Sequence, residues 1–159
     1  MSEGNNGGLV FDQQFIYAQL DVDSFADAIN KMSQKLIKQN YVVSEFPEKV
    51  IAREKDFPTG LSLSNMNISI PHTEASYVHK TVVSVATLKN KINVHSMIDP
   101  KQEIQSSMLF LISVNDPKGQ ITILKQLMKL FQKENLLDTI LHLEDAGAIA
   151  QELNNAVEN

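Results

Sequence analysis

The most apolar run of the chain, Met108-Leu-Phe-Leu-Ile-Ser-Val114, is seven residues long. A run of this length fits a strand better than a buried helix, which would need roughly ten residues or more. A strand with so few polar positions has to be covered on both of its faces. Asn115-Asp116-Pro117 follows directly, and these residue types cap helices and occupy their first turn. The run therefore predicts a central strand that leads straight into a long helix, with Ile121, Leu124, Leu127 or Met128, and Phe131 on its buried face.

Strands and helices are predicted to alternate along the rest of the chain. Stretches of period two or rich in β-branched residues predict strands at 15–20, 61–63, 68–70, 82–88 and 108–114, with a short strand or edge at 92–94. Apolar residues spaced by three and four predict helices from about 24 to 39, from 46 to before Pro58, after Pro117, over 136–141 and from Asp145 onward. The segment from 99 to 105 is polar and is predicted to be a loop.

This alternation predicts an α/β fold with a mixed central sheet of about five strands and helices on both faces. Most strand pairs are expected to be parallel. The unit from Leu61 to His72 has room only for a turn, so its two strands are expected to form an antiparallel hairpin. Residues 1–10, which include three glycines and two asparagines, are predicted to be a disordered tail. Residues 11–159 are expected to form one domain.

Composition limits the classes of function. A net charge of −5 over 159 residues argues against general nucleic-acid binding, which needs a basic face. The chain has no cysteine, which excludes disulfides and a cysteine nucleophile. The apolar run at 108–114 is far shorter than the roughly 20 residues of a membrane span, and the N-terminus has no signal-peptide pattern. A cytoplasmic protein without direct membrane insertion is expected.

His72 is the first candidate for chemistry. Ile68 and Ile70 alternate with a serine, as in a half-buried strand, and Pro71 ends the strand because it lacks an N–H group. His72 is thereby placed just past a strand end, where its ring can face solvent. A neutral imidazole nitrogen is a nucleophile near neutral pH. The alternative is that His72 is only a turn residue.

Three short motifs carry a family resemblance: Arg53-Glu54, Pro58-Thr59-Gly60 and Ile70-Pro71-His72. In this order and spacing they resemble the active-site region of the EIIA domains of the bacterial sugar phosphotransferase system, in the mannitol–fructose superfamily. Phe57, before Pro-Thr-Gly, and Glu74, two residues after the histidine, resemble the galactitol-type members. The resemblance extends from about Phe15 to the C-terminus and implies a single EIIA type-2 domain.

The resemblance implies a phosphotransferase that carries a phosphoryl group on His72. The group would come from the carrier protein HPr and pass to an EIIB partner, which phosphorylates galactitol or a related sugar during uptake through the EIIC membrane component. Arg53 would hold the phosphoryl oxygens, because a guanidinium stays charged and presents a fork of donors. No cofactor is implied.

Supporting roles are predicted for residues around these two. Backbone N–H groups near Thr59, Gly60 and Thr73 could bind the phosphate, although Gly60 is better explained as a turn residue with positive φ. Glu74 could fix the tautomer of His72 or be solvated. Gln120 stands where the mannitol and fructose members have a second histidine, and it can only hydrogen-bond. Lys118 could add charge there, or be an ordinary exposed lysine.

Other functions remain open at this point. A regulatory module of the nitrogen-regulatory type would use the same histidine as a signal, and a hydrolase of phosphate esters is a weaker alternative. His79, His95 and His142 are not spaced as metal ligands, so no metal site is predicted. Of these, His95 could line the cleft or be partly buried, and His142 suits a helix C-terminus. Phe57, Met66 and Met97 are predicted to form an apolar rim where partners dock.

Overall fold

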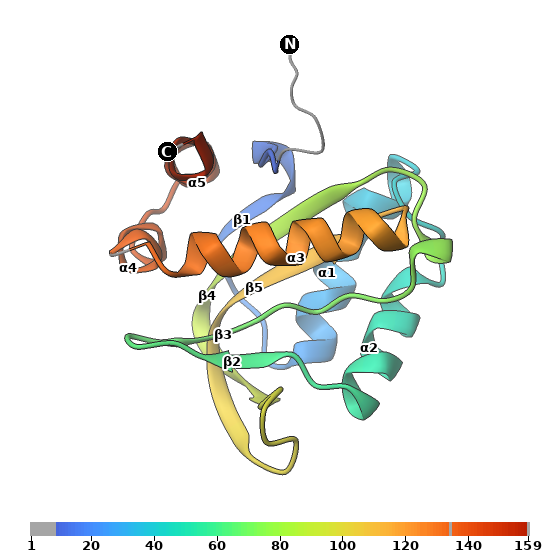
Figure 1. Ribbon diagram of the computed structural model, residues 1–159, viewed down its shortest axis with the longest axis horizontal. Helices are drawn as coiled ribbons and strands as arrows, with labels where there is room; N and C mark the ends of the chain where they lie inside the picture. The colour runs from blue at the N-terminus through green and yellow to red at the C-terminus, as the bar shows by residue number, and fades with distance from the viewer. Residues whose placement is uncertain (1–8, 134, 159) are drawn as a thin grey trace.

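The computed structural model describes residues 9–133 and 135–158 (Figure 1). The predicted tail falls mostly outside the described residues, which begin at Leu9. Leu9 itself is 4% exposed and belongs to the hydrophobic core. Among the described residues, no helix is both long and apolar enough to cross a membrane.

Five α-helices and five strands form the described part of the chain. The helices are α1 (Phe25–Lys38), α2 (Phe46–Asp56), α3 (Pro117–Phe131), α4 (Leu136–Leu141) and α5 (Ala146–Glu158). The strands are β1 (Ile16–Leu20), β2 (Gly60–Ser62), β3 (Asn67–Ser69), β4 (Val82–His95) and β5 (Glu103–Ser113). Two 3₁₀ turns, η1 (Gln13–Phe15) and η2 (Ala75–Tyr77), complete the order. Every predicted helix is present at nearly its predicted position.

The strands form one mixed sheet in the order β1-β4-β5-β3-β2, which confirms the predicted fold class. Strands β2 and β3 form the predicted antiparallel hairpin. Parallel pairs are less dominant than predicted, because β4 and β5 are also antiparallel, while β1–β4 and β3–β5 are parallel. The reason is the short link from β4 to β5, since only antiparallel neighbours can be joined by so few residues.

Strand β4 is a single strand where the sequence predicted two. It continues through Lys89, Asn90 and Lys91, and β5 begins at Glu103, within the segment predicted as a loop. The far part of this pair, residues 92–95 with 103–106, extends past β1 and β3 as a two-stranded ribbon, and the start of β2 lies against its end at Ser96 (Figure 1). The exposed polar residues of the ribbon, such as Asn93 and His95, alternate with the buried Ile92 and Val94, so one face of the ribbon is in water and the other packs on the core.

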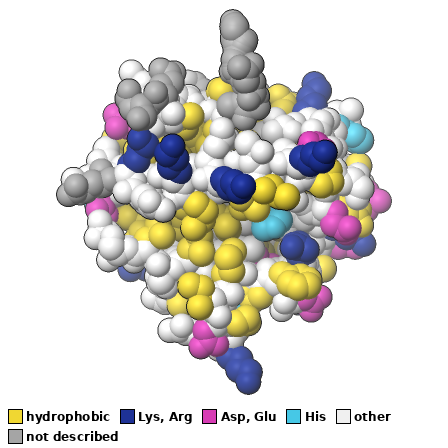
Figure 2. Space-filling view, viewed as in Figure 1, with side chains coloured by type: hydrophobic (Ala, Val, Ile, Leu, Met, Phe, Trp, Pro, Cys, Tyr) yellow, Lys and Arg dark blue, Asp and Glu magenta, His cyan; other side chains and the backbone are white. Residues whose placement is uncertain are grey.

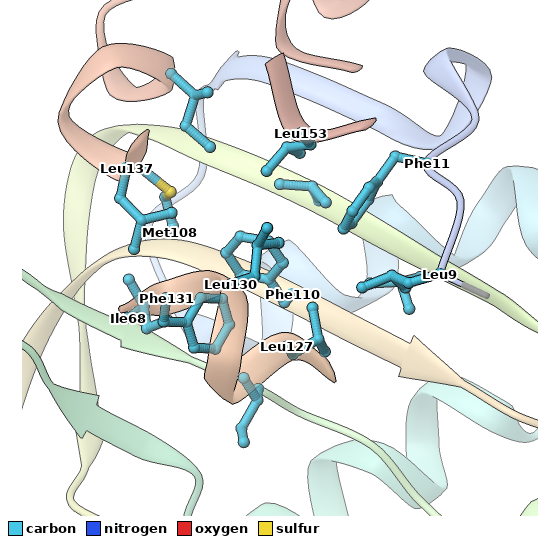
Figure 3. Close-up of a cluster of buried hydrophobic side chains, with 14 of the residues drawn as sticks. Leu9, Phe11, Ile68, Met108, Phe110, Leu127, Leu130, Phe131, Leu137 and Leu153 are labelled. Carbon is cyan, nitrogen blue, oxygen red and sulfur yellow. The ribbon is translucent and has the colours of Figure 1, made fainter. Parts of the chain in front are cut away.

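The sheet separates two hydrophobic clusters. Alternate residues of β5 face opposite sides: Met108, Phe110 and Ile112 lie in one cluster, and Leu109 and Leu111 lie in the other. Helices α3, α4 and α5 cover the first face, whose side chains Figure 3 shows in part. Helices α1 and α2 cover the second face. The helices therefore flank the sheet on both faces, as predicted.

The buried stripe of α3 differs from the predicted one. Ile123, Leu127 and Leu130 are buried, together with Phe131, whereas Ile121 is 57% exposed and Met128 is 39% exposed. Residues 123, 127 and 130 follow the same spacing of four and three as the predicted set, so the pattern fits both registers. The predicted and observed sets share Leu127 and Phe131, and Phe131 meets the ring of Phe110 edge-on at a centroid distance of 4.9 Å. Ile123 and Leu130 join them in the core in place of Ile121, which is left on the surface.

Candidate functional site

His72 lies where three segments of the fold meet. The chain continues past β3 alongside β5, since the N–H of Ile112 donates to the carbonyl oxygen of Pro71 at 2.9 Å and His72 pairs with Ile112. Strand β5 ends at Ser113, one residue after Ile112, and helix α3 begins at Pro117. The start of α3 therefore follows closely on the strand that pairs with His72. The last turn of α2 borders a cleft of about 360 Å³ here, lined by Arg53, Phe57, Thr59, His72, Met97 and Leu124, among others.

The ring of His72 is fixed by one hydrogen bond. Its Nδ1 atom lies 2.9 Å from the carbonyl oxygen of Ile70, and a carbonyl oxygen can only accept. Nδ1 therefore carries the proton, and Nε2 keeps its lone pair. Burial lowers the pKa of His72 below its usual 6.5, and the positive charge of Arg53 lowers it further, against the opposing effect of the Ile70 bond. At neutral pH the ring is an uncharged nucleophile at Nε2.

Arg53 provides the positive charge beside this ring. It lies in the last turn of α2, and its guanidinium carbon is 4.8 Å from the ring centroid of Phe57, a cation–π contact. Its Nε atom is buried and has no hydrogen-bond partner among the described residues. A buried donor without a partner is uncommon in a folded protein. Arg53 also lines the cleft, so its guanidinium lies beside any anion bound there. The geometry suits binding of phosphoryl oxygens.

Glu54, the neighbour of Arg53, is a site residue to which the sequence assigned no role. The N–H and the hydroxyl of Thr59 both donate to its carboxylate, at 2.8 Å each. Burial raises the pKa of Glu54 to about 7, although the Thr59 hydrogen bonds and the charges of Arg53 and His95 act in the opposite direction. The motif Arg53-Glu54 was the available signal, but nothing in it distinguishes a half-buried carboxylate from a solvated one.

The chain matches one known protein family over nearly its whole length. The family described as "Phosphoenolpyruvate-dependent sugar phosphotransferase system, EIIA 2" matches residues 9–156. The chain belongs to this EIIA 2 family. The match spans the whole sheet and every segment that lines the cleft, so the site described above is part of the family domain.

Relatives of the chain are galactitol-specific components. The galactitol-specific EIIA component of Escherichia coli K12 is 23% identical over 131 residues, which cover 82% of this chain and 87% of that protein. The galactitol-specific EIIA component of Escherichia coli O157:H7 matches with the same identity and coverage. These similarities confirm the resemblance to galactitol-type EIIA proteins that the sequence motifs indicated.

Solved structures share the fold. The IIA mannitol protein from Escherichia coli superposes with a TM-score of 0.73 at 20% identity, covering 90% of this chain and 98% of that one. IIA-Ntr, the nitrogen regulatory protein from Neisseria meningitidis, gives a TM-score of 0.70 at 19% identity, covering 91% of this chain and 96% of its own. A chain in the complex of enzyme IIA and phosphorylated enzyme IIB of the Escherichia coli mannitol system superposes with a TM-score of 0.74 at 19% identity. The superposition covers 92% of this chain and 99% of that one.

Gly60 in this EIIA chain is not the positive-φ turn residue that was predicted. It is the first residue of β2, and its φ lies outside the left-handed region. Glycine is needed here for a steric reason, because a Cβ at this position would lie 2.5 Å from the carbonyl oxygen of His95. The N–H of Met97 donates to the carbonyl oxygen of Gly60 at 2.8 Å, which holds β2 against the end of β4. Only glycine fits this approach.

The EIIA site brings Gln120 to the segment that follows His72. Its side-chain amide donates to the carbonyl oxygen of Thr73 at 3.1 Å, and Thr73 is buried. Glu74 and Lys118 are both exposed. The bond that fixes the His72 ring comes from Ile70 rather than Glu74. Gln120 therefore supports the backbone beside His72 instead of supplying charge.

The other three histidines lie outside the cleft lining. His95 is exposed, contrary to a partly buried position, and its Nδ1 atom lies 2.9 Å from the carbonyl oxygen of Pro100. His142 is the C-cap of α4, as its helix-end position predicted, and His79 is exposed. Within the described residues, no three His, Cys, Asp or Glu side chains are grouped so that they could hold a metal ion.

An apolar rim borders the cleft, but its members differ from the prediction. Phe57 is 60% exposed and Met97 is 40% exposed, and both line the cleft. Met66 does not belong to the rim, because it packs against the core at the turn between β2 and β3. Leu124 of α3 lines the cleft as well. Figure 2 shows hydrophobic side chains gathered on this face around a histidine.

Proposed function

We propose that this EIIA protein is a phosphocarrier, which accepts a phosphoryl group from phospho-HPr on Nε2 of His72 and passes it to an EIIB partner. The observation that carries the proposal is the neutral His72 ring with a free Nε2 beside the unpaired donor of Arg53. Family membership supports phosphotransfer over the hydrolase alternative. The protein would work in the cytoplasm, with no nucleic acid bound and no direct insertion into the membrane.

The proposed transfer exchanges one phosphorus–nitrogen bond for another. Nε2 of His72 attacks the phosphorus on the HPr histidine, a new Nε2–P bond forms, and the old N–P bond breaks with its electron pair left on the HPr nitrogen. Positive charge that develops on the His72 ring is stabilised by the carbonyl oxygen of Ile70, which accepts from Nδ1. Arg53 offsets the charge on the phosphoryl oxygens. The protein's task is alignment and charge stabilisation, because such transition states are loose.

Galactitol or a related sugar is the proposed final acceptor, by way of EIIB and the EIIC membrane component. The support is the similarity to galactitol-specific relatives. An EIIB partner is supported further by the fold likeness to the enzyme IIA chain that is bound to phosphorylated enzyme IIB. The regulatory alternative is supported by the likeness to the nitrogen regulatory protein, which is a likeness of fold alone.

Incubation with phosphoenolpyruvate, enzyme I and HPr tests the proposal directly. The protein should take up one phosphate per chain, labile in acid and stable in alkali, as expected for a phosphohistidine. His72→Ala should take up none, and His142→Ala, changed at an exposed helix end, should be labelled normally. If His72→Ala is still labelled at the normal rate, the assignment fails. Restoration of galactitol growth in a strain that lacks its own galactitol EIIA would test the sugar.

A further inference from the structure

The carboxylate of Glu54 has no part in the proposed transfer, yet it is one of the most firmly held side chains at the site. Its Oε2 accepts from the N–H of Thr59 and its Oε1 accepts from the Thr59 hydroxyl, at 2.8 Å each. Thr59 is only 3% exposed, so water does not compete freely for these bonds. Hydrogen bonds to a charged group are stronger than neutral ones. We call this pair the Glu54–Thr59 clamp.

The clamp connects to the imidazole of His72 through two further hydrogen bonds. The carbonyl oxygen of Thr59 accepts from the N–H of Ile70 at 3.2 Å. The carbonyl oxygen of Ile70 then accepts from Nδ1 of His72 at 2.9 Å. Each bond fixes the residue that makes the next one. The position of Glu54 is thereby transmitted to the ring whose Nε2 has to attack.

The same clamp acts on Arg53. Glu54 follows Arg53 in the last turn of α2, so the clamp ties that turn to the start of the β2–β3 hairpin. Arg53, Thr59 and His72 all line one cleft. We propose that Glu54 is a positioning residue for phosphoryl transfer, which holds the His72 ring through Thr59 and Ile70 and holds Arg53 through the end of α2. The inference rests on the proposed function of this site.

The strength of the clamp should depend on whether Glu54 is ionised. The ionised carboxylate accepts both Thr59 donors, whereas the protonated acid has one oxygen that donates, so the Thr59 hydroxyl has to rotate. Burial raises the pKa of Glu54 to about 7, which puts this change near neutral pH. The charged or titratable groups that act on Glu54 are Arg53 on its own helix and His95 at the end of β4. The clamp should be tightest above pH 7.

Glu54→Gln tests the proposal, with Glu48→Gln as the matched control, since it makes the same chemical change at an exposed residue in the first turn of the same helix. Single-turnover transfer from phospho-HPr would be measured against HPr concentration and pH. In Glu54→Gln the saturating rate should fall by roughly tenfold to a hundredfold, since misplacement by about 1 Å can cost that much. The half-saturating HPr concentration should stay within about twofold, and Glu48→Gln should be close to wild type. The rise in wild-type rate through pH 7 should vanish in Glu54→Gln.

A second measurement needs no HPr. The ¹⁵N chemical shifts of the His72 imidazole report which nitrogen carries the proton. The wild-type ring should be almost wholly the Nδ1–H tautomer, and Glu54→Gln should show a mixture, in protein shown by thermal unfolding to be folded. An unchanged tautomer, or a loss of rate with an unchanged pH profile, would overturn the proposal. Should wild-type protein take no label from phospho-HPr, the proposed function fails, and the tautomer comparison still decides the role of Glu54.

Discussion

The guanidinium of Arg53 lies over the ring of Phe57, four residues later, at 4.8 Å. Phe57 is the C-cap of α2, and its N–H donates to the carbonyl oxygen of Arg53 at 2.7 Å. The arginine is thus held by an aromatic face instead of a carboxylate: no ion pair of Arg53 occurs among the described residues. Its charge is therefore left for an anion in the cleft.

Arg53→Lys should lose most of the transfer while the protein stays folded. A lysine keeps the charge but not the fork of donors, and removal of one preorganised electrostatic donor typically costs roughly 10²–10³ in rate. A substitution at a partly exposed helix position should change stability by about 0.5 kcal/mol or less. Rapid-quench transfer from phospho-HPr and thermal unfolding check the two parts, with Lys55→Ala on the same helix as control. Transfer at wild-type speed would show that Arg53 has no part in the reaction.

Transfer should decline on acidification as His72 takes up a proton. Burial and Arg53 lower the pKa of His72, so the ring should titrate below 6.5 and be neutral at pH 7. The neutral form is favoured in the folded protein, so this group makes folding more stable as pH rises toward 6.5. Proton NMR of the ring measures the midpoint. Arg53→Gln should move it upward, because the nearby positive charge is removed, and a midpoint above 6.5 in the wild type would contradict the expectation.

The exposed rim should contribute to partner binding. Exposed apolar side chains beside a reactive group are typical of docking surfaces. Met97→Ser should raise the half-saturating concentrations of HPr and EIIB alike by several-fold, because both partners have to reach the same Nε2. Val10→Ser, at an exposed apolar residue outside the cleft lining, is the control and should change neither. Titration of one partner against the other should show competition. A ternary complex of all three proteins would refute a shared surface.

Gly60→Ala should destabilise the fold. The added Cβ would lie 2.5 Å from the carbonyl oxygen of His95, and backbone cannot move aside as a flexible side chain can. Overpacking of this kind costs about 1–3 kcal/mol. Gly147→Ala in α5 is the matched control, since its Cβ would lie 3.1 Å and 3.2 Å from side-chain ends of Asp145 and Gln13. Urea unfolding of the two variants compares them, and equal midpoints would contradict the steric argument.

Local signals in the sequence predicted much of the fold. Helix α2 ends before Pro58, and β3 ends before Pro71. Each proline fixes its own φ and keeps the residue before it out of the helical region. The tight spacing between 61 and 72 left only a hairpin. These features act over a few residues, so they can be read without knowledge of the tertiary structure. These local features place His72 and Arg53 where both line the cleft. The roles of the two residues in phosphotransfer stay predictions.

Features that depend on packing were predicted less well. Ile123 and Leu130 of α3 are buried where Ile121 was expected, because the spacing of apolar residues does not show which of them meet the sheet. Lys89 to Lys91 were interpreted as a strand break, since a sequence does not show that β4 and β5 extend beyond their neighbours. A glutamate in the sequence does not show whether its carboxylate is solvated or, like that of Glu54, accepts hydrogen bonds from another residue such as Thr59. In each case the deciding partner lies in another element.

The strand order has a consequence for the chain as it leaves the ribosome. Strand β3 has only two neighbours, β2 and β5, and β5 is synthesised well after His72. Before β5 emerges, β3 is paired only in a hairpin of two three-residue strands, and isolated hairpins are marginally stable in water. At that stage the carbonyl oxygen of Pro71 lacks the N–H of Ile112 as its donor, and α3 has not yet been synthesised. A half-made chain should therefore expose the histidine without the aligned site, so the proposed ability to accept a phosphoryl group should arise only late in translation.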